Sequence, residues 1–255
     1  MEVKEGDYIL IYLDERRKFL TRVVSGKQFH THKGSIDLES IIGEHYGSRA
    51  KTHIGKEFVV LRPKISDFIM KIRRKTQIIY PQDIGMVIMF AGIGPGDRVV
   101  EGGTGVGAGT IALAYHVRPS GRVYSYDVRE DLIEQARENL QKMNLIEYVE
   151  LRNEDITEGI DEEEVDAVVL DIPTPWLVVP HARRALKDSE YFVSFSPTMD
   201  QAVNTTEALR ENGFVDVRTF ESMLRPIRAV RGRARPEMLM VGHTAYITLS
   251  RKSRG

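Results

Sequence analysis

Apolar residues in the C-terminal part of the chain follow one repeating pattern. Short runs rich in Val, Leu and Tyr alternate with longer segments whose apolar residues recur at helical spacing. The alternation predicts an α/β fold with a doubly wound parallel sheet, whose ligands bind beyond the carboxyl ends of the strands. The predicted strands are 98–101, 122–127, 149–152, 165–170 and 191–195, the predicted helices are 82–91, 110–117, 132–143, 181–187 and 199–212, and strands 214–220 and 245–249 are expected to form an antiparallel edge.

Residues up to Leu61 show a different pattern. Runs of β-branched and aromatic residues at 8–13 and 58–61 are separated by glycine-containing turns, which predicts a small β-rich module. A short helix is expected from Ser66 to Lys75. We therefore expect two domains, a β-rich N-terminal domain with a linker helix over 1–75 and a catalytic domain over 76–255.

The amino-acid composition excludes several classes of function. None of the 255 residues is cysteine, which excludes a thiolate nucleophile, a zinc ribbon and an iron–sulfur cluster and indicates a reducing, cytoplasmic location. No apolar run approaches the roughly 20 residues of a membrane span. Because 36 Lys and Arg balance 37 Asp and Glu, a nucleic-acid partner has to be met by a local basic patch. The 29% of charged residues is a weak indication of a thermophilic source.

The strongest local motif is Glu101-Gly-Gly-Thr-Gly-Val-Gly-Ala-Gly109, between a predicted strand and a predicted helix. Glycines let the backbone approach a ligand closely, and a helix N-terminus presents free N–H groups to it. A tight turn packed against the sheet would give the same loop. Asp127 ends the next strand, about 20 residues on, where a carboxylate accepts hydrogen bonds from two ribose hydroxyls. This spacing fits NAD and S-adenosylmethionine equally.

Two further acidic residues follow the next two strands. Asp155 comes after Arg152-Asn-Glu, and Asp171 lies in Leu170-Asp-Ile-Pro-Thr-Pro-Trp176. A hydride-transfer enzyme does not need carboxylates at three successive strand ends. A nucleoside-bearing methyl donor with an aminated acceptor can use all three, so the pattern favours methyl transfer.

The combined motifs resemble the tRNA (adenine-N1)-methyltransferases that act on the T loop, in their archaeal form. The resemblance extends over essentially the whole chain, including the N-terminal module. It implies a class I S-adenosylmethionine-dependent methyltransferase fold, a homotetramer, and tRNA methylation at adenines 57 and 58. The segments that carry it are Glu101–Gly107, Asp127, Asp155, Leu170–Trp176, Gln77–Pro81 and Phe195-Ser-Pro-Thr198.

The resemblance also implies a role for each site residue. The loop from Gly103 to Gly107 would hold the methionine end of S-adenosylmethionine, with Glu101 near its ammonium group. Asp127 would bind the ribose and Asp155 the adenine amino group, while Asp171 and Tyr80 would meet the target adenine. The implied cofactor-binding set is Glu101, Gly103, Thr104, Gly105, Val106, Gly107, Asp127, Val128, Asp155, Ile156 and Asp171, and the implied catalytic residues are Asp171 and Tyr80.

The chemistry agrees with these residue types. N1 of adenine carries a lone pair, so its methylation needs alignment with the methyl group and stabilisation of the developing ring charge rather than a strong base. Asp171 can accept a hydrogen bond from the exocyclic amine and take a proton if one is lost. Tyr80 and Trp176 offer aromatic faces to a base removed from its stack, although ordinary core packing would also explain either residue.

Five arginines are concentrated in one Pro-flanked stretch, whose density suits contact with RNA phosphates. Pairing with the acidic run 158–164 across a subunit interface would give the same pattern. The smaller basic clusters Arg16–Lys18 and Lys71–Lys75 fit a solvated surface as well as RNA contact. The predicted RNA-binding residues are Arg225, Arg228, Arg231, Arg233 and Arg235.

No metal site is predicted. His30 and His32 are expected on one side of a strand, with His45 and His53 nearby in sequence, but no carboxylate lies at ligand spacing.

Three other functions compete with the tRNA methyltransferase. A small-molecule or protein methyltransferase of the corrin or isoaspartyl type could share the sheet, but the N-terminal module and the arginines argue against it. A non-catalytic RNA-binding subunit would be expected to lose the glycine loop or Asp171, and both are intact. A nicotinamide-dependent dehydrogenase is disfavoured because no acid or base for hydride transfer is visible.

Overall fold

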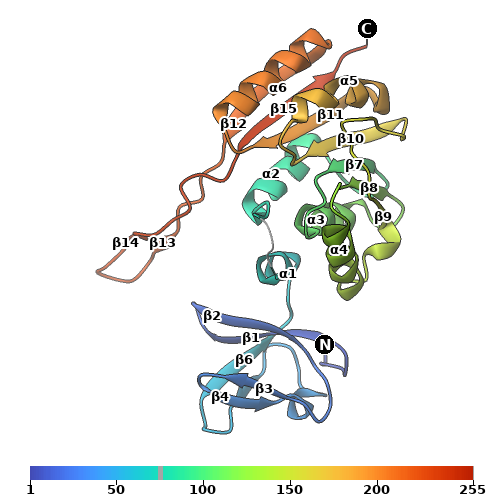
Figure 1. The fold of residues 1–255 in the computed structure, drawn as a ribbon. Helices are drawn as coiled ribbons and strands as arrows, with labels where there is room; N and C mark the ends of the chain where they lie inside the picture. Colours follow the sequence, from blue (N-terminus) through green and yellow to red (C-terminus); the bar gives the residue numbers. More distant parts are fainter. Residues whose placement is uncertain (74–76, 255) are drawn as a thin grey trace. The chain divides into compact units, whose positions relative to one another are not determined.

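The computed structural model describes residues 1–73 and 77–254. The chain forms two compact units, Met1–Ile72 and Arg73–Gly255, shown in blue and in green to red in Figure 1. The domain boundary expected at Lys75 lies outside the described residues.

The N-terminal unit is built on an antiparallel sheet with strand order β2-β1-β6-β5. Alternate residues of β1 and β6, such as Ile9, Ile11, Phe58 and Val60, are buried in its core, as the period-two pattern of a half-buried strand requires. The elements are β1 (Tyr8–Asp14), β2 (Arg17–Arg22), β3 (Gln28–Thr31), β4 (Gly34–Asp37), a 3₁₀ turn (Glu39–Ile41), β5 (Arg49–Lys51), β6 (Glu57–Leu61) and α1 (Ile65–Lys71).

Two sequence expectations in this unit are wrong. The helix expected to reach Lys75 ends at Lys71, because the backbone of Ile72, with φ −55° and ψ 137°, is no longer helical. His32 lies in the turn between β3 and β4, so it does not share a strand face with His30.

The His53 Nδ1 atom accepts the Ser35 N–H at 2.7 Å, and the described part of the chain contains no group of three or more potential metal ligands.

The second unit carries a seven-stranded sheet with strand order β12-β15-β11-β10-β7-β8-β9. The five strands from β11 to β9 are parallel, which confirms the doubly wound α/β sheet. The elements are α2 (Pro81–Ala91), β7 (Arg98–Gly102), α3 (Ala108–Val117), β8 (Arg122–Tyr126), α4 (Glu130–Lys142), a 3₁₀ turn (Ile146–Tyr148), β9 (Val149–Arg152), β10 (Val165–Leu170), α5 (Pro175–Ala185), β11 (Leu186–Ser196), α6 (Met199–Glu211), β12 (Phe214–Glu221), β13 (Ile227–Arg228), β14 (Arg235–Pro236) and β15 (Tyr246–Lys252).

The last two long strands form the end of the sheet in an unexpected order. β15 pairs antiparallel with both β11 and β12, so the antiparallel strand is inserted next to the edge, and β12 occupies the edge itself. The expectation that these two strands form an antiparallel edge is therefore confirmed.

Helices cover both faces of the sheet (Figure 1). α5 and α6 pack on each other and on the β10–β11–β12 end, while α3 and α4 pack on β7, β8 and β9. The core under α5 and α6 includes an edge-to-face contact between Phe192 and Phe214, with ring centroids 5.9 Å apart. Among the described residues, no helix combines the length and apolarity needed to cross a membrane.

Helix α5 begins earlier than expected. Pro175 is its first residue, whereas the sequence pattern predicted a helix over 181–187. Pro180 lies inside the helix although a proline normally ends or kinks one, and residues 186–187 belong to β11 instead.

A long segment connects β12 to β15. We call residues 223–239 the arm; all of them are exposed, and they include the two-stranded hairpin β13–β14, which projects away from the sheet (Figure 1). The arm holds the five predicted RNA-binding arginines together with the large exposed apolar residues Met223, Leu224, Ile227, Val230, Met238 and Leu239.

Candidate functional site

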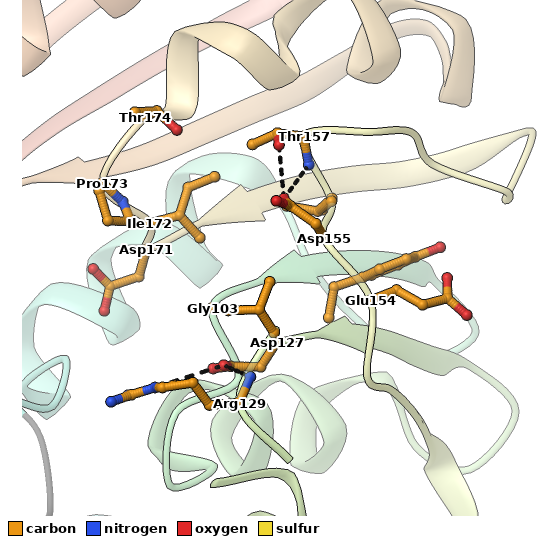
Figure 2. Close-up of a pocket in the computed structure, with 13 residues that line it drawn as sticks. Gly103, Asp127, Arg129, Glu154, Asp155, Thr157, Asp171, Ile172, Pro173 and Thr174 are labelled. Atoms are coloured by element: carbon orange, nitrogen blue, oxygen red, sulfur yellow. Dashed lines mark hydrogen bonds and ion pairs between the residues drawn. The ribbon is translucent and has the colours of Figure 1, made fainter. Parts of the chain in front are cut away.

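The carboxyl ends of β7, β8, β9 and β10 surround a cavity of about 420 Å³. Its volume is within the range of sites for small ligands and cofactors. Figure 2 shows the three predicted aspartates on separate loops around it. The lining residues are Gly103, Tyr126, Asp127, Val128, Arg129, Glu154, Asp155, Ile156, Thr157, Asp171, Ile172, Pro173 and Thr174.

Gly103 brings two strand ends into close contact. Its φ of +91° suits glycine, and a Cβ atom there would lie only 2.2 Å from the Asp171 carbonyl oxygen. The Gly103 N–H donates to the Tyr126 carbonyl at 2.8 Å, and the Asp171 N–H donates to the Gly102 carbonyl at 2.8 Å. The loop after β7 therefore presents bare backbone to the cavity.

Asp127 is held by the two loops beside it. Its Oδ2 atom accepts the Gly105 N–H at 2.8 Å, and its Oδ1 atom accepts the Arg129 N–H at 2.9 Å. The side chain is only 9% exposed. Each carboxylate oxygen can accept a second hydrogen bond, so a ligand diol can still donate to an Asp127 whose position is fixed.

Asp155 is oriented by its own loop. Its Oδ1 atom accepts both the N–H of Thr157 at 2.9 Å and the hydroxyl of Thr157 at 2.7 Å, as the dashed lines in Figure 2 mark. This arrangement leaves Oδ2 available to a donor in the cavity.

Asp171 connects this cavity to a second one. Among the described lining residues, it alone belongs to both cavities. Its side chain is open to the cavities, yet desolvation by the surrounding protein raises its pKa to about 6. The second cavity measures about 140 Å³ and is lined by Gln77, Ile78, Ile79, Asp83, Asp171, Phe195, Pro197, Thr244 and Ala245.

Glu101 lies behind the glycine loop and is 3% exposed. Its Oε2 atom accepts the hydroxyls of Thr110 and Ser125, each at 2.6 Å. Burial raises the pKa of Glu101 to about 7; the two hydroxyls oppose this shift, and the charges of Asp171 and Asp127 add to it. Glu101 is thus poised to ionise when a cation approaches.

The structure separates the predicted cofactor-binding residues into two groups. Gly103, Asp127, Val128, Asp155, Ile156 and Asp171 line the larger cavity, whereas Glu101, Thr104, Gly105, Val106 and Gly107 are not among its described lining residues. Thr104 and Val106 are buried, and the Thr104 hydroxyl meets that of Ser125 at 2.6 Å. These residues shape the loop, and their contact with a cofactor stays a prediction.

Tyr80 and Trp176 line neither cavity in the described part of the chain. Tyr80 is the half-buried N-cap residue of α2, and Trp176 is half-buried in the first turn of α5. The role of Tyr80 at the target base stays a prediction.

Sequence reasoning missed the neutral residues that hold the carboxylates. Thr110 and Ser125 fix Glu101, and Thr157 fixes Asp155. None of the three belongs to a motif that the spacing of strands and glycines would reveal.

Comparisons with known proteins agree with this geometry. The family model "tRNA methyltransferase complex GCD14 subunit" matches residues 58–238, and the model "TrmI-like N-terminal" matches residues 3–49. The chain belongs to this tRNA methyltransferase family.

Two TrmI relatives are similar to this chain over nearly their whole length. The tRNA (adenine(57)-N(1)/adenine(58)-N(1))-methyltransferase TrmI of Methanocaldococcus jannaschii is 34% identical over 94% of each chain. The tRNA (adenine(58)-N(1))-methyltransferase TrmI of Thermus thermophilus is 31% identical, covering 92% of this chain and 93% of its own.

Two solved structures confirm the S-adenosylmethionine-dependent methyltransferase fold. A SAM-dependent O-methyltransferase of Thermotoga maritima has a TM-score of 0.94 and 38% identity, covering 99% of this chain and 95% of its own. The tRNA (m1A58) methyltransferase TrmI of Aquifex aeolicus has a TM-score of 0.87 and 30% identity, with full coverage of both chains.

We expect Gly103→Ala to weaken binding of S-adenosylmethionine. The new Cβ would meet the Asp171 carbonyl, so the loop of the free variant moves away from its native position. Restoring the strained backbone on binding costs about 1–3 kcal/mol, which corresponds to about 5- to 150-fold in affinity. Calorimetric titration measures the effect. Gly159→Ala is the control, since a Cβ there would have no neighbour within 4 Å; equal affinities for the two variants would contradict the role of Gly103.

Glu101→Gln should stabilise the ligand-free protein in a pH-dependent way. The folded pKa of about 7 exceeds the ordinary 4.5, so the folded state holds an extra proton between these values and loses stability as pH rises through them. The melting temperature of the variant should therefore gain on wild type from pH 5 to pH 8. A difference that stays constant over this range would show that Glu101 ionises normally.

Proposed function

We propose that this protein transfers a methyl group from S-adenosylmethionine to N1 of adenine in the T loop of tRNA, at position 58 and, as in the archaeal-type relatives, at position 57. Family membership supports the reaction class, and the activities for which the TrmI relatives are named support the substrate. The observation that carries the proposal is Asp171, which borders both a nucleoside-sized cavity and a smaller one.

The larger cavity suits S-adenosylmethionine. Gly103 contributes backbone to its wall, Asp127 can accept from the two ribose hydroxyls, and Asp155 can accept from the adenine amine. When bound, the cofactor supplies a methyl group on a sulfonium, and the electron pair of the broken C–S bond stays with sulfur.

Asp171 acts on the acceptor. Methylation turns the neutral adenine ring into a cation, so a carboxylate that accepts a hydrogen bond from its exocyclic amine stabilises the charge as it develops. With a pKa of about 6, Asp171 is largely ionised at neutral pH and can also receive an amine proton. The adenine has to leave its stack to enter such a site.

The arm supports two further proposals. Its arginines are exposed and suit contact with tRNA phosphates, whereas its exposed apolar residues suit self-association, for which we propose a homotetramer. The acidic run 158–164 is the alternative partner of these arginines. Two of its residues already form ion pairs within the chain, because Asp161 and Glu162 pair with Arg152 at 2.7 and 2.6 Å. From the cysteine-free, highly charged composition, we propose a cytoplasmic enzyme of a thermophile.

Asp171→Ala should lower the rate of 1-methyladenosine formation by about 100-fold or more, because the charge on the ring loses its partner. Affinity for S-adenosylmethionine should change little. The assay combines labelled S-adenosylmethionine, an unmodified tRNA transcript and nucleoside analysis of the product. Asp188→Ala is the matched control, because Asp188 lies near the start of β11, whereas the site lies at the carboxyl ends of the strands. Absence of 1-methyladenosine with the wild-type enzyme would refute the acceptor assignment.

Replacing the five arm arginines with alanine should weaken tRNA binding and flatten its dependence on salt, since each phosphate contact contributes about one unit to the slope. The mass in solution should stay that of a tetramer if the apolar residues hold the assembly. Filter binding and light scattering measure the two quantities. An unchanged salt slope would remove the arginines from the RNA interface.

A further inference from the structure

The smaller cavity has the size of one aromatic ring. Its volume is about 140 Å³, and a protein cavity of about 150 Å³ holds one benzene molecule. It can therefore receive the six-membered ring of a purine, which carries N1 and the exocyclic amine, while the rest of the nucleotide stays outside.

Asp83 lines this cavity and is 1% exposed. It lies in the first turn of α2, where its N–H donates to the Tyr80 carbonyl at 3.0 Å. The Ser222 hydroxyl, just beyond β12, donates a short hydrogen bond to its Oδ1 atom. Burial of a carboxylate is unfavourable without compensation, and the helix N-terminus and one hydroxyl provide it here.

The charged residues that line the cavity are both acidic. Asp83 and Asp171 are its two charged residues, and the described lining contains no cationic side chain. The Thr244 Oγ1 atom is also buried, without a hydrogen-bond partner in the described part of the chain, which is typical of a site that a polar ligand completes. A ring that becomes positively charged fits this environment better than a neutral one.

We propose that Asp83 is a second carboxylate of the acceptor site and stabilises the positive charge of the adenine ring during methyl transfer. The inference rests on the proposed function. As the N1 lone pair forms the new bond to carbon, the C–S bond breaks toward sulfur and the positive charge moves from the sulfonium to the ring. A fixed carboxylate that is 1% exposed favours that movement more strongly than one in solvent.

The test compares Asp83→Asn with wild type. Asparagine keeps the shape of the side chain and an oxygen for the Ser222 hydroxyl but removes the charge. We expect kcat to fall at least about ten-fold, with KM for tRNA, affinity for S-adenosylmethionine and melting temperature nearly unchanged. Asp67→Asn is the control, since Asp67 holds the same position in α1 and accepts the Lys64 N–H at 2.8 Å. A kcat within two-fold of wild type would overturn the proposal.

A binding measurement keeps the proposal testable if Asp83→Asn does not fold. T-arm RNA hairpins carry either 1-methyladenosine, which is cationic at neutral pH, or neutral 1-methylinosine at the target position. In the Asp171→Asn protein, the remaining Asp83 should still favour the cationic hairpin at least about three-fold, as fluorescence anisotropy would show. Equal affinities would overturn the role of Asp83. Absence of 1-methyladenosine with wild type would instead refute the proposed function itself.

Discussion

The close contact between the ends of β7 and β10 is the constraint on which the site depends. At Gly103 the backbone passes so near the Asp171 carbonyl that a side chain has no room, and the Asp171 N–H bonds to Gly102. The same contact that closes the middle of the sheet therefore places the glycine loop beside Asp171. Because Asp171 also borders the smaller cavity, the proposed donor and acceptor sites share one wall.

The site gathers carboxylates and holds them mainly with neutral donors. Backbone amides bind Asp127, a threonine binds Asp155, and hydroxyls bind Glu101. Neutral donors fix a carboxylate without cancelling its charge, so the negative potential remains available to a cationic ligand. Because burial raises the pKa of Glu101 to about 7, ionisation of this carboxyl opposes folding, a common compromise between stability and function.

Local patterns predicted the parts of the structure that depend on neighbouring residues. The alternation of strands and helices and the three strand-end aspartates followed from periodicity and from the topology of parallel sheets. The insertion of β15 beside β11 could not be predicted, since strand order depends on packing between distant segments. The smaller cavity was also missed, because it assembles Asp83, Phe195 and Thr244, which share no motif. The early start of α5 was missed as well, since the helix continues through Pro180 despite the tendency of proline to end a helix.

A structure of the protein with S-adenosylhomocysteine and a T-arm RNA would test the central claim most directly. The account predicts that the ribose contacts Asp127, that the sulfur atom lies toward Asp171, and that the six-membered ring of the flipped adenine occupies the smaller cavity between Asp171 and Asp83. A sulfur atom directed away from Asp171, or an adenine bound outside that cavity, would contradict the account.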